Sequence, residues 1–330
     1  MTRHFCTYFD RRYLPNALAL AGSLRRHCPG FRLWALCLDD ASHAALRRLA
    51  IPEVAPISLA EFEDGDAALA EAKRNRSTIE YYFTCTPSLP LFVLRHQPEV
   101  ETITYLDADL FFFSDPAPLF EEIGSSAVAI IPHRFPAANT RFERYGIFNV
   151  GWLTFRRCDA AFACLTWWRE RCLEWCFDRE EPSRFADQKY LDDWPQRFES
   201  VHVVRHKGAN VASWNLANYE MRRQDGKVFV DDQPLLFFHF HHLKRRRTWL
   251  FETDFAPHGA RLNRVLKEDV FTPYFRLLDE QAAVATGVSD RSAADPLRPI
   301  TPGDLGFSLR TAISDFAAGN LLLYVGGRVL

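Results

Sequence analysis

The sequence predicts an α/β fold in which a mostly parallel sheet is flanked by helices. Two observations indicate this class. Strand and helix signals alternate through the first hundred residues, and a further apolar strand then ends in Tyr105–Phe113, a stretch that contains two aspartates. A βαβα alternation is typical of a right-handed parallel sheet covered by helices. The length of 330 residues allows one large or two modest domains.

The expected elements follow from periodicity and from the turn residues that bound them. In chain order they are the strand Phe5–Tyr8, the helix Leu14–His27, the strand Phe31–Leu38, the helix Ala41–Leu49, the helical segment Thr78–Arg95, the strand Ala127–Ile131, the loop and strand Gly146–Phe155, the helices Cys158–Phe177 and Ala186–Trp194, and the strands Val201–Val204 and Leu235–Phe240. Pro87 and Pro90 are expected to interrupt the segment Thr78–Arg95, because proline cannot complete the helical hydrogen bonds. The stretch 284–308 is rich in turn residues and predicts a linker, and Leu305–Leu323 predicts a helix. We therefore expect a domain over 1–255 and a C-terminal helical extension with its linker over 256–330.

Composition excludes several classes. A net charge of −2 gives no electrostatic reason to expect nucleic acid as a partner. No stretch approaches the roughly 20 apolar residues that span a bilayer, and Met1–Phe5 does not begin a secretory signal. The eight cysteines are scattered and are expected to be reduced thiols in a cytoplasmic protein. Cys172 and Cys176 lie four apart, which allows zinc binding, but packing on an amphipathic helix is the favoured interpretation.

Asp107 and Asp109 are the residues that point most directly to chemistry. They follow the apolar residues of a predicted strand, and in an extended chain they would share one side. Two carboxylates in apolar surroundings repel each other unless a cation lies between them, and oxygen ligands favour Mn²⁺ or Mg²⁺. A second Asp-x-Asp, Asp64-Gly65-Asp66, lies in an acidic, alanine-rich stretch and predicts only a solvated loop or helix start. The apolar context therefore carries the inference of a metal-bound diphosphate.

A cluster of histidines provides a second signal. The strand Leu235–Phe240 runs into His239, His241 and His242, and the basic run Lys244–Arg247 follows. Imidazole is a suitable Mn²⁺ ligand beside carboxylates, and a lysine can hold a phosphate. Two common nucleotide-binding motifs are absent, because the turn after the first strand, Tyr8–Tyr13, contains no glycine and no P-loop occurs.

Taken in order, these motifs resemble the GT-A glycosyltransferases, and within them the retaining glycogenin and lipopolysaccharide-galactosyltransferase group. The resemblance covers roughly residues 3–247. It rests on Asp10-Arg11-Arg12-Tyr13, Ser23-Leu24, Tyr105-Leu106-Asp107-Ala108-Asp109, Phe148-Asn149-Val150-Gly151, Asp187-Gln188 and His239-Phe240. It implies a GT-A type, Rossmann-like sheet and transfer of a hexose from a nucleotide-diphosphate sugar, of which a UDP-sugar is the expected example. Retention of configuration, a glycan or lipid-linked acceptor and a role in polysaccharide biosynthesis are also implied.

The resemblance also implies a role for each matching residue. Metal ligands for Mn²⁺ or Mg²⁺ would be Asp107, Asp109 and His239. Catalytic groups would be Asp187, Gln188 and Asn149. Nucleotide and donor contacts would come from Thr7, Tyr8, Asp10, Tyr13, Asp107, Ala108, Gly151, Asn210 and Lys244.

The chain departs from the pattern of this group at two places. Its histidine segment lacks the usual glycine, so His241 is an alternative to His239 as the third ligand. The arginine that usually precedes the Asp-x-Asp strand is missing from Glu80–Phe83, and Arg74 or Arg76 would have to replace it.

Other interpretations stay open. Trp214 and Asn215 fit either a sugar pocket or ordinary packing, and Asp187 could be a helix N-cap. Alternative functions are a metal-dependent phosphohydrolase, a nucleotidyltransferase acting on sugar nucleotides, or a protein whose basic run Lys244–Arg247 docks on anionic lipid at the inner membrane face.

Overall fold

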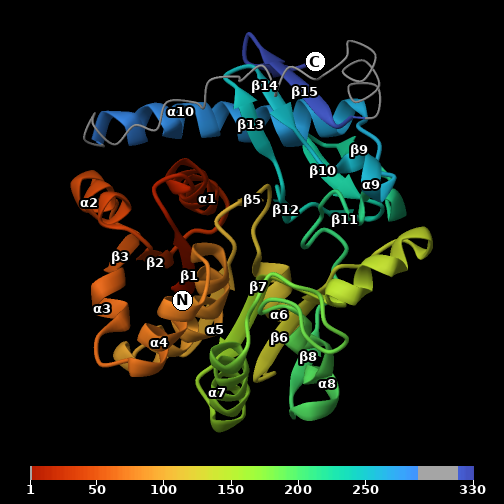
Figure 1. The fold of residues 1–330 in the computed structure, drawn as a ribbon. Coiled ribbons are helices and arrows are strands. Elements are labelled where there is room, and N and C mark those ends of the chain that lie inside the picture. Colours follow the sequence, from red (N-terminus) through yellow and green to blue (C-terminus); the bar gives the residue numbers. More distant parts are fainter. Residues whose placement is uncertain (1, 289–318) are drawn as a thin grey trace.

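A seven-stranded, mostly parallel sheet forms the centre of the molecule (Figure 1). The computed structural model describes residues 2–288 and 319–330. The strand order is β3-β2-β1-β4-β7-β6-β8, with bounds β1 Arg3–Phe9, β2 Phe31–Cys37, β3 Val54–Ser58, β4 Thr102–Leu106, β6 Val128–Pro132, β7 Phe148–Arg156 and β8 Val201–Val203. Within this sheet β7 alone runs antiparallel to its neighbours. The predicted fold class is confirmed.

Helices cover both faces of this sheet, so each face is the base of its own hydrophobic core. One core is closed by α1 (Leu14–His27), α2 (Asp40–Leu49) and α6 (Ala117–Ile123). The other is closed by α3 (Leu59–Glu63), α4 (Ala67–Asn75), α5 (Thr78–His96), α7 (Asp159–Glu174), the 3₁₀ helix η2 (Lys189–Asp193) and α8 (Trp194–Arg197). Cys172 and Cys176 are fully buried in this second core, in agreement with the packing interpretation. Asp66 caps α4 through the backbone N–H of Leu69, so the second Asp-x-Asp is a helix start, as expected.

Helix α5 corrects one expectation, because it continues through Pro87 and Pro90 without a break. Its central residues, from Thr84 to Leu94, are almost all buried against the sheet and α7. Burial of that apolar surface outweighs the two hydrogen bonds that the prolines remove. Ser77 and Glu80 form a capping box that fixes its start.

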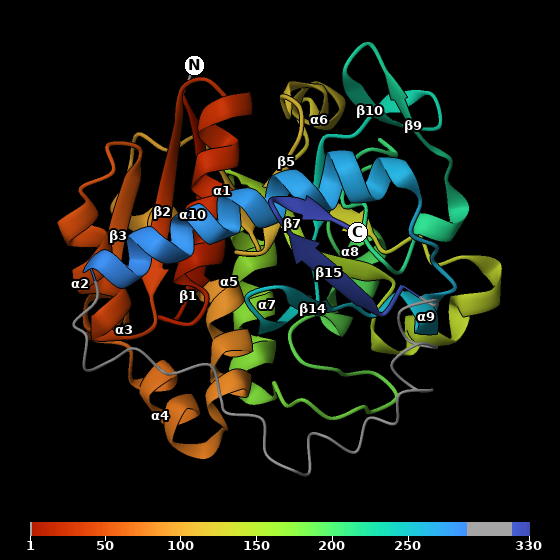
Figure 2. The same cartoon turned by 90° about the horizontal axis from the view of Figure 1, so that it is seen from above.

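The C-terminal part adds a second small sheet and a long helix. The sheet has the order β13-β14-β15-β16, with bounds β13 Lys244–Arg247, β14 Leu250–Glu252, β15 Leu321–Val325 and β16 Arg328–Val329. The expected helix Leu305–Leu323 is therefore wrong at its end, where Leu321–Leu323 pair with β14; residues 305–318 lie outside the described residues. The expected linker 284–308 begins inside α10 (Thr272–Val288), which lies across α1 (Figures 1 and 2). The predicted domain boundary at residue 255 stays a prediction, and this small sheet has strands on both sides of it.

Remaining elements surround the edge of the sheet where the strands end. A three-stranded sheet contains β9 (Met221–Gln224), β10 (Lys227–Val230) and β11 (Gln233–Pro234), and short helices are η1 (Ala137–Tyr145), η3 (Leu216–Asn218), α9 (Phe255–His258) and the π-helix η4 (Leu266–Phe271). Most important for function is the antiparallel pair of β5 (Leu110–Phe112) with β12 (Phe237–His239), which joins Leu110 to His239 in register. This pair brings the aspartates next to the histidine cluster.

Candidate active site

Asp107 and Asp109 lie in a tight turn between β4 and β5. The turn is closed by the N–H of Leu110, which donates to the carbonyl of Asp107 at 3.2 Å. The extended chain expected at this point is therefore wrong, because β4 ends at Leu106 and β5 leaves the main sheet to pair with β12. Both carboxylates nevertheless face the same histidine, so the predicted convergence is correct while its cause is a turn.

His239 is the histidine between the two carboxylates. Its Nε2 atom lies 3.1 Å from Asp109 Oδ1 and 3.5 Å from Asp107 Oδ2, and its side chain is 1% exposed. Despite these distances Nε2 has no well-directed hydrogen-bond partner. A buried nitrogen and two carboxylates that converge without mutual hydrogen bonds form a donor set suited to a divalent cation.

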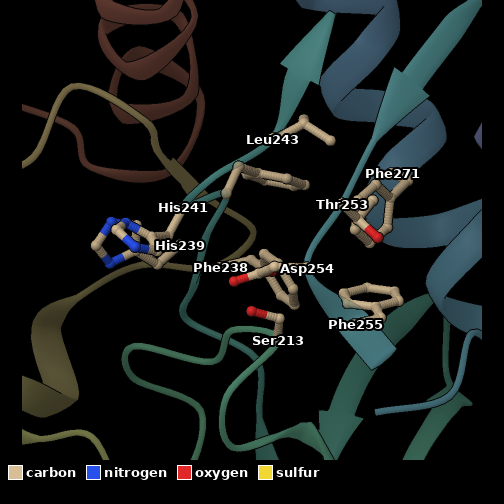
Figure 3. Close-up of a pocket in the computed structure, with 10 residues that line it drawn as sticks. Ser213, Phe238, His239, His241, Leu243, Thr253, Asp254, Phe255 and Phe271 are labelled. Atoms are coloured by element: carbon tan, nitrogen blue, oxygen red, sulfur yellow. The ribbon is translucent and has the colours of Figure 1, made fainter. Parts of the chain in front are cut away.

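His241 belongs to the same cluster. Possible ligand atoms of Asp109, His239 and His241 all lie within 4.8 Å of one another. Among the described residues, these three form the group that could hold a metal ion. The rings of His239 and His241 are 5.6 Å apart and extend to the same side, away from Phe255 and Phe271 (Figure 3). The sequence left His239 and His241 as alternatives, and the structure places His239 near both carboxylates and His241 near Asp109.

Burial and charge set the protonation behaviour of this cluster. Burial raises the pKa of Asp107 to about 6; the neighbouring His239 opposes this rise and the Asp109 charge adds to it. Burial also disfavours the charged form of Asp109, but the nearby His239 holds the pKa of this carboxyl below its usual range. For His239, burial favours the neutral ring, whereas the Asp109 carboxylate raises its pKa. A cation would compete with that proton for the same atoms.

Gly151 packs directly beneath this cluster. Its carbonyl accepts from the N–H of Asp107 at 3.1 Å, and its own N–H donates to Asn149 Oδ1 at 3.0 Å. A β-carbon at position 151 would lie 2.7 Å from Asn149 Oδ1 and 2.8 Å from His239 Cε1, closer than such atoms approach in proteins. Only glycine fits here, although its φ is ordinary.

We expect Gly151→Ala to displace His239 and thereby to lower both stability and metal affinity. Overpacking of this kind costs about 1–3 kcal/mol of unfolding free energy. Thermal melting and Mn²⁺ titration measure the two effects. Gly287→Ala is the control, because Gly287 is exposed on α10, has an ordinary φ, and an added β-carbon there meets no atom within 4 Å. Wild-type Mn²⁺ affinity in Gly151→Ala would contradict the close packing described.

Asp187 and Gln188 lie near the cluster, on the loop before η2. The 3₁₀ helix η2 begins after Gln188 without a side-chain cap, so Asp187 is not its N-cap. Burial raises the pKa of Asp187 to about 7; a hydrogen bond from Thr86 opposes this rise, and the Asp107 charge adds to it. Gln188 accepts from Asn149 at 3.3 Å and donates to the carbonyl of Tyr145 at 3.1 Å.

Residues of β1 and the following turn occupy the neighbouring part of the edge. Thr7 is fully buried with its hydroxyl unpaired, and Tyr8 hydrogen-bonds to Thr86 at 3.1 Å. Asp10 accepts from the backbone of Arg12 and Tyr13, which shapes the turn, and the ring of Tyr13 is 49% exposed. Ala108, between the two aspartates, is 7% exposed.

The basic residues differ most from expectation. Arg76 does not replace the missing arginine, because its guanidinium bonds to Thr84 and the carbonyl of Leu173 and packs over Phe177. Arg74 is exposed and pairs with Glu71. Lys244 is exposed at the start of β13, opposite Glu252. The sequence could not place these cations because long flexible side chains reach different partners from similar backbone positions.

Three residues around the cluster were missed as functional candidates or left open: the buried His133 and Trp214, and the partly buried Asp254. His133 follows β6, and Nδ2 of Asn149 lies 3.3 Å from its Nε2; burial lowers its pKa to about 3, so the ring is neutral. Trp214 is packed edge-on against His133, His239 and His241, in agreement with packing rather than an open sugar platform. Asp254 lies 3.5 Å from His258 and 4.0 Å from His242. No local pattern marks His133 or Asp254, because their neighbours are distant in sequence.

The C-terminal elements support this site from behind. Phe240, between the two histidines, stacks on Tyr274 of α10 with ring centroids 3.7 Å apart. Tyr274 accepts a hydrogen bond from Asn16 of α1 at 2.9 Å, so α10 connects the first helix to the histidine segment. Within residues 2–288 and 319–330, none of the helices has the length and hydropathy needed to cross a bilayer.

Comparison with solved structures identifies the fold. The galactosyltransferase LgtC in complex with donor and acceptor sugar analogues superposes with a TM-score of 0.51 at 16% identity, covering 86% of this chain and 95% of that one. A structure of LgtC with a substitution in its active site gives 0.52 at 14% identity, covering 84% and 95%. The architecture is thus of the GT-A glycosyltransferase type, as the motifs predicted.

Comparison with curated proteins identifies the family. The protein YfnD of Bacillus subtilis (strain 168), described as uncharacterized, is 35% identical over 242 residues, which cover 72% of this chain and 77% of YfnD. YfnF of the same organism, also described as uncharacterized, is 33% identical over 248 residues, covering 73% and 81%. The chain belongs to the family of YfnD and YfnF. No family model matches it.

Proposed function

We propose that this protein is a metal-dependent glycosyltransferase that moves a hexose from a nucleotide-diphosphate sugar, a UDP-sugar, to a glycan or lipid-linked acceptor. The observation that carries the proposal is the convergence of Asp107, Asp109 and the unpartnered Nε2 of His239 at the strand-end edge of a GT-A fold. Ligands of α/β sheets bind at such edges. The LgtC structure with donor and acceptor sugar analogues supports a sugar donor and acceptor by analogy of fold.

Each group at the edge has a part in this proposal. Asp107, Asp109, His239 and His241 would hold Mn²⁺ or Mg²⁺, which when bound neutralises the departing nucleoside diphosphate. The nucleoside would lie on the β1 side, against Thr7, Tyr8, Asp10 and Tyr13, with Ala108 facing it from the turn. Lys244 is the nearest basic residue in sequence to the ligands and would contact the phosphates.

Asp187 and Gln188 would face the reacting sugar. The buried carboxylate of Asp187 would stabilise the positive charge that develops on the sugar ring in the transition state. The amide of Gln188 would orient the hydroxyl groups of that sugar. Asn149 hydrogen-bonds to Gln188 at 3.3 Å and so would contribute to the orientation of that amide. Retention of configuration is part of the proposal, as in the group that the motifs resemble.

Thermal-shift measurements with a panel of nucleotide sugars, with and without Mn²⁺, test the proposal. We expect a shift that requires both the metal and a diphosphate nucleotide, because binding to the folded state alone raises stability. Transfer to an acceptor and simple hydrolysis of the donor are then separated by product analysis. Cleavage of the donor to a nucleoside monophosphate and a sugar 1-phosphate, without transfer to any acceptor, would favour the phosphohydrolase alternative. Formation of a nucleoside triphosphate and a sugar 1-phosphate when diphosphate is added would favour a nucleotidyltransferase.

We expect His241→Ala to reduce Mn²⁺ affinity about 3- to 10-fold and to reduce the preference for Mn²⁺ over Mg²⁺, since imidazole suits Mn²⁺ better than Mg²⁺. The control is His242→Asn, because His242 has φ of 55° and asparagine tolerates that conformation. Calorimetric titration with each metal gives the two affinities. Equal losses in both variants would remove His241 from the ligand set.

Peripheral contact with a membrane remains a separate proposal. The strand Lys244–Arg247 carries four basic residues next to the exposed Trp249, and this combination suits anionic lipid surfaces. Two of these charges are already paired, Arg245 with Asp279 and Arg246 with Glu252. Sedimentation with anionic and neutral vesicles would measure the contact.

A further inference from the structure

The hydrogen bonds around Asn149 and Asn210 have a definite direction, because one of them begins at a backbone N–H. The N–H of Gly151 can only donate, so the Asn149 atom that it meets at 3.0 Å is the carbonyl oxygen Oδ1. The Asn210 side chain meets the same oxygen at 3.2 Å and must therefore present its Nδ2 there. The amide of Asn149 is thereby oriented without reference to any ligand.

The direction continues from Asn210 to the histidine. With Nδ2 turned to Asn149, the Oδ1 atom of Asn210 lies 3.2 Å from His239 Nδ1. An oxygen of this kind accepts only, so His239 Nδ1 carries the hydrogen. In the neutral ring the lone pair is then on Nε2, the atom that faces Asp107 and Asp109.

The surrounding contacts keep this arrangement from reversing. Nδ2 of Asn149 points to Gln188 Oε1 and His133 Nε2, both at 3.3 Å, and His133 uses its other nitrogen toward the carbonyl of Ile147. The backbone of Asn210 has φ of 56°, a left-handed conformation that asparagine tolerates, and its carbonyl accepts from Asn215 at 2.9 Å. If the amide of Asn149 or Asn210 were turned over, donors would face donors or acceptors would face acceptors at several of these contacts.

We infer that Asn149 and Asn210 are positioning residues that fix the tautomer of His239, so that its Nε2 is available as a metal ligand. The second ring nitrogen of a metal-bound histidine is usually fixed by a carboxylate or a backbone carbonyl. Here the side-chain amides of Asn149 and Asn210 supply that contact. The N–H of Gly151 orients the first of them, and the carbonyl of Gly151 accepts from the backbone N–H of Asp107. The inference rests on the proposed metal site but makes a statement about the metal-free protein as well.

The test has a spectroscopic part that needs neither metal nor sugar nucleotide. Long-range ¹H–¹⁵N correlation of ¹⁵N-histidine-labelled protein, at about pH 9.5, where the ordinary imidazole is neutral, reports which nitrogen carries the hydrogen. For His239 we expect a protonated, pyrrole-type Nδ1 and an unprotonated, pyridine-type Nε2. The His239 signals are assigned as those that disappear in the His239→Gln variant. The opposite tautomer in the wild-type protein overturns the inference, whatever the protein's activity.

Variants supply the second part, read out as Mn²⁺ affinity from the electron paramagnetic resonance of free Mn²⁺. Asn210→Gly suits the left-handed backbone and removes the acceptor, and we expect affinity to fall about 10- to 100-fold. Asn210→Asp keeps an acceptor at His239 Nδ1, although its second oxygen then meets Asn149 Oδ1. We therefore expect the Nδ1–H tautomer to be kept and Mn²⁺ affinity to fall less than in Asn210→Gly. In Asn149→Leu the Asn210 amide is free to turn, and a mixture of His239 tautomers is expected.

Asn215→Ala is the matched control. Asn215 is an equally buried amide of the same loop that bonds to the carbonyls of His133 and Asn210 and does not contact His239. We expect it to lower the melting temperature while the tautomer and Mn²⁺ affinity stay near wild type. If it weakens Mn²⁺ binding as much as Asn210→Gly, or if Asn210→Asp weakens Mn²⁺ binding as much as Asn210→Gly does, the effect is loosening of the loop and the inference fails. Wild-type protein with the expected tautomer but no Mn²⁺ affinity would instead contradict the proposed function alone.

Discussion

Asp109→Ala is expected to abolish Mn²⁺ binding and sugar transfer while leaving the protein folded. Asp109 Oδ1 is the atom nearest to His239 Nε2, at 3.1 Å, and its side chain is only 13% exposed. Leaving-group stabilisation by a metal is worth roughly 3 kcal/mol or more, so we expect transfer to fall by at least about 100-fold. Mn²⁺ titration and donor turnover measure the two effects.

Its control is Asp64→Ala, in the second Asp-x-Asp of the chain. Asp64 is exposed at the end of α3, so its loss should change neither metal affinity nor turnover. Circular dichroism and melting curves establish that both variants fold. Full activity of Asp109→Ala in a metal-free assay would rule out metal-assisted transfer at this site.

Asp187→Asn is expected to lower activity by about 100-fold or more and to raise stability at alkaline pH. Burial raises the pKa of Asp187 from 3.8 to about 7, so between these values the folded chain holds a proton that the unfolded chain has lost. Stability contributed by this group therefore falls as pH rises through that window, and the penalty is complete above about pH 7. Asparagine has no such penalty, and we expect about 1–3 kcal/mol more unfolding free energy at pH 8.

The pH profile of turnover provides the direct check. If the ionised carboxylate supports charge on the sugar, wild-type activity should rise as the pH passes about 7. Thr86→Val keeps the size of the side chain and removes the hydrogen bond that lowers the pKa of Asp187, so the rise should move to higher pH. An unchanged profile in Thr86→Val, or an Asp187→Asn protein as active as wild type, would show that Asp187 acts elsewhere than on the reacting sugar.

The local chemistry of the site could be predicted because it depends on short motifs. The resemblance to GT-A glycosyltransferases implied that His239 lies beside Asp107 and Asp109, with His241 as the alternative, and the distances of His239 agree; metal binding by these residues stays a prediction. Elements with strong periodicity, such as the helix Leu14–His27, were also correct to the residue. Their signals are contained in a single window of sequence, so no distant contact is needed to establish them.

Predictions failed where distant contacts override local preference. Local propensity alone would break α5 at its prolines and would make Leu321–Leu323 helical, yet burial against the sheet and pairing with β14 decide otherwise. Arg74 or Arg76 was expected to replace the missing arginine, but Arg76 donates to the carbonyl of Leu173, 97 residues away, and is held there.

Residue types alone establish which donor atoms this edge of the sheet possesses: two carboxylates and a group of imidazoles. Their arrangement depends on contacts between distant segments of the folded chain. A turn, not an extended strand, brings Asp107 and Asp109 together; His239 lies near both, and His241 lies near Asp109. The tautomer of His239 depends on Asn149 and Asn210, which lie 90 and 29 positions before it in the chain. Which group donates and which accepts in these hydrogen bonds is set by the packing of distant segments, so no local pattern in the sequence indicates it.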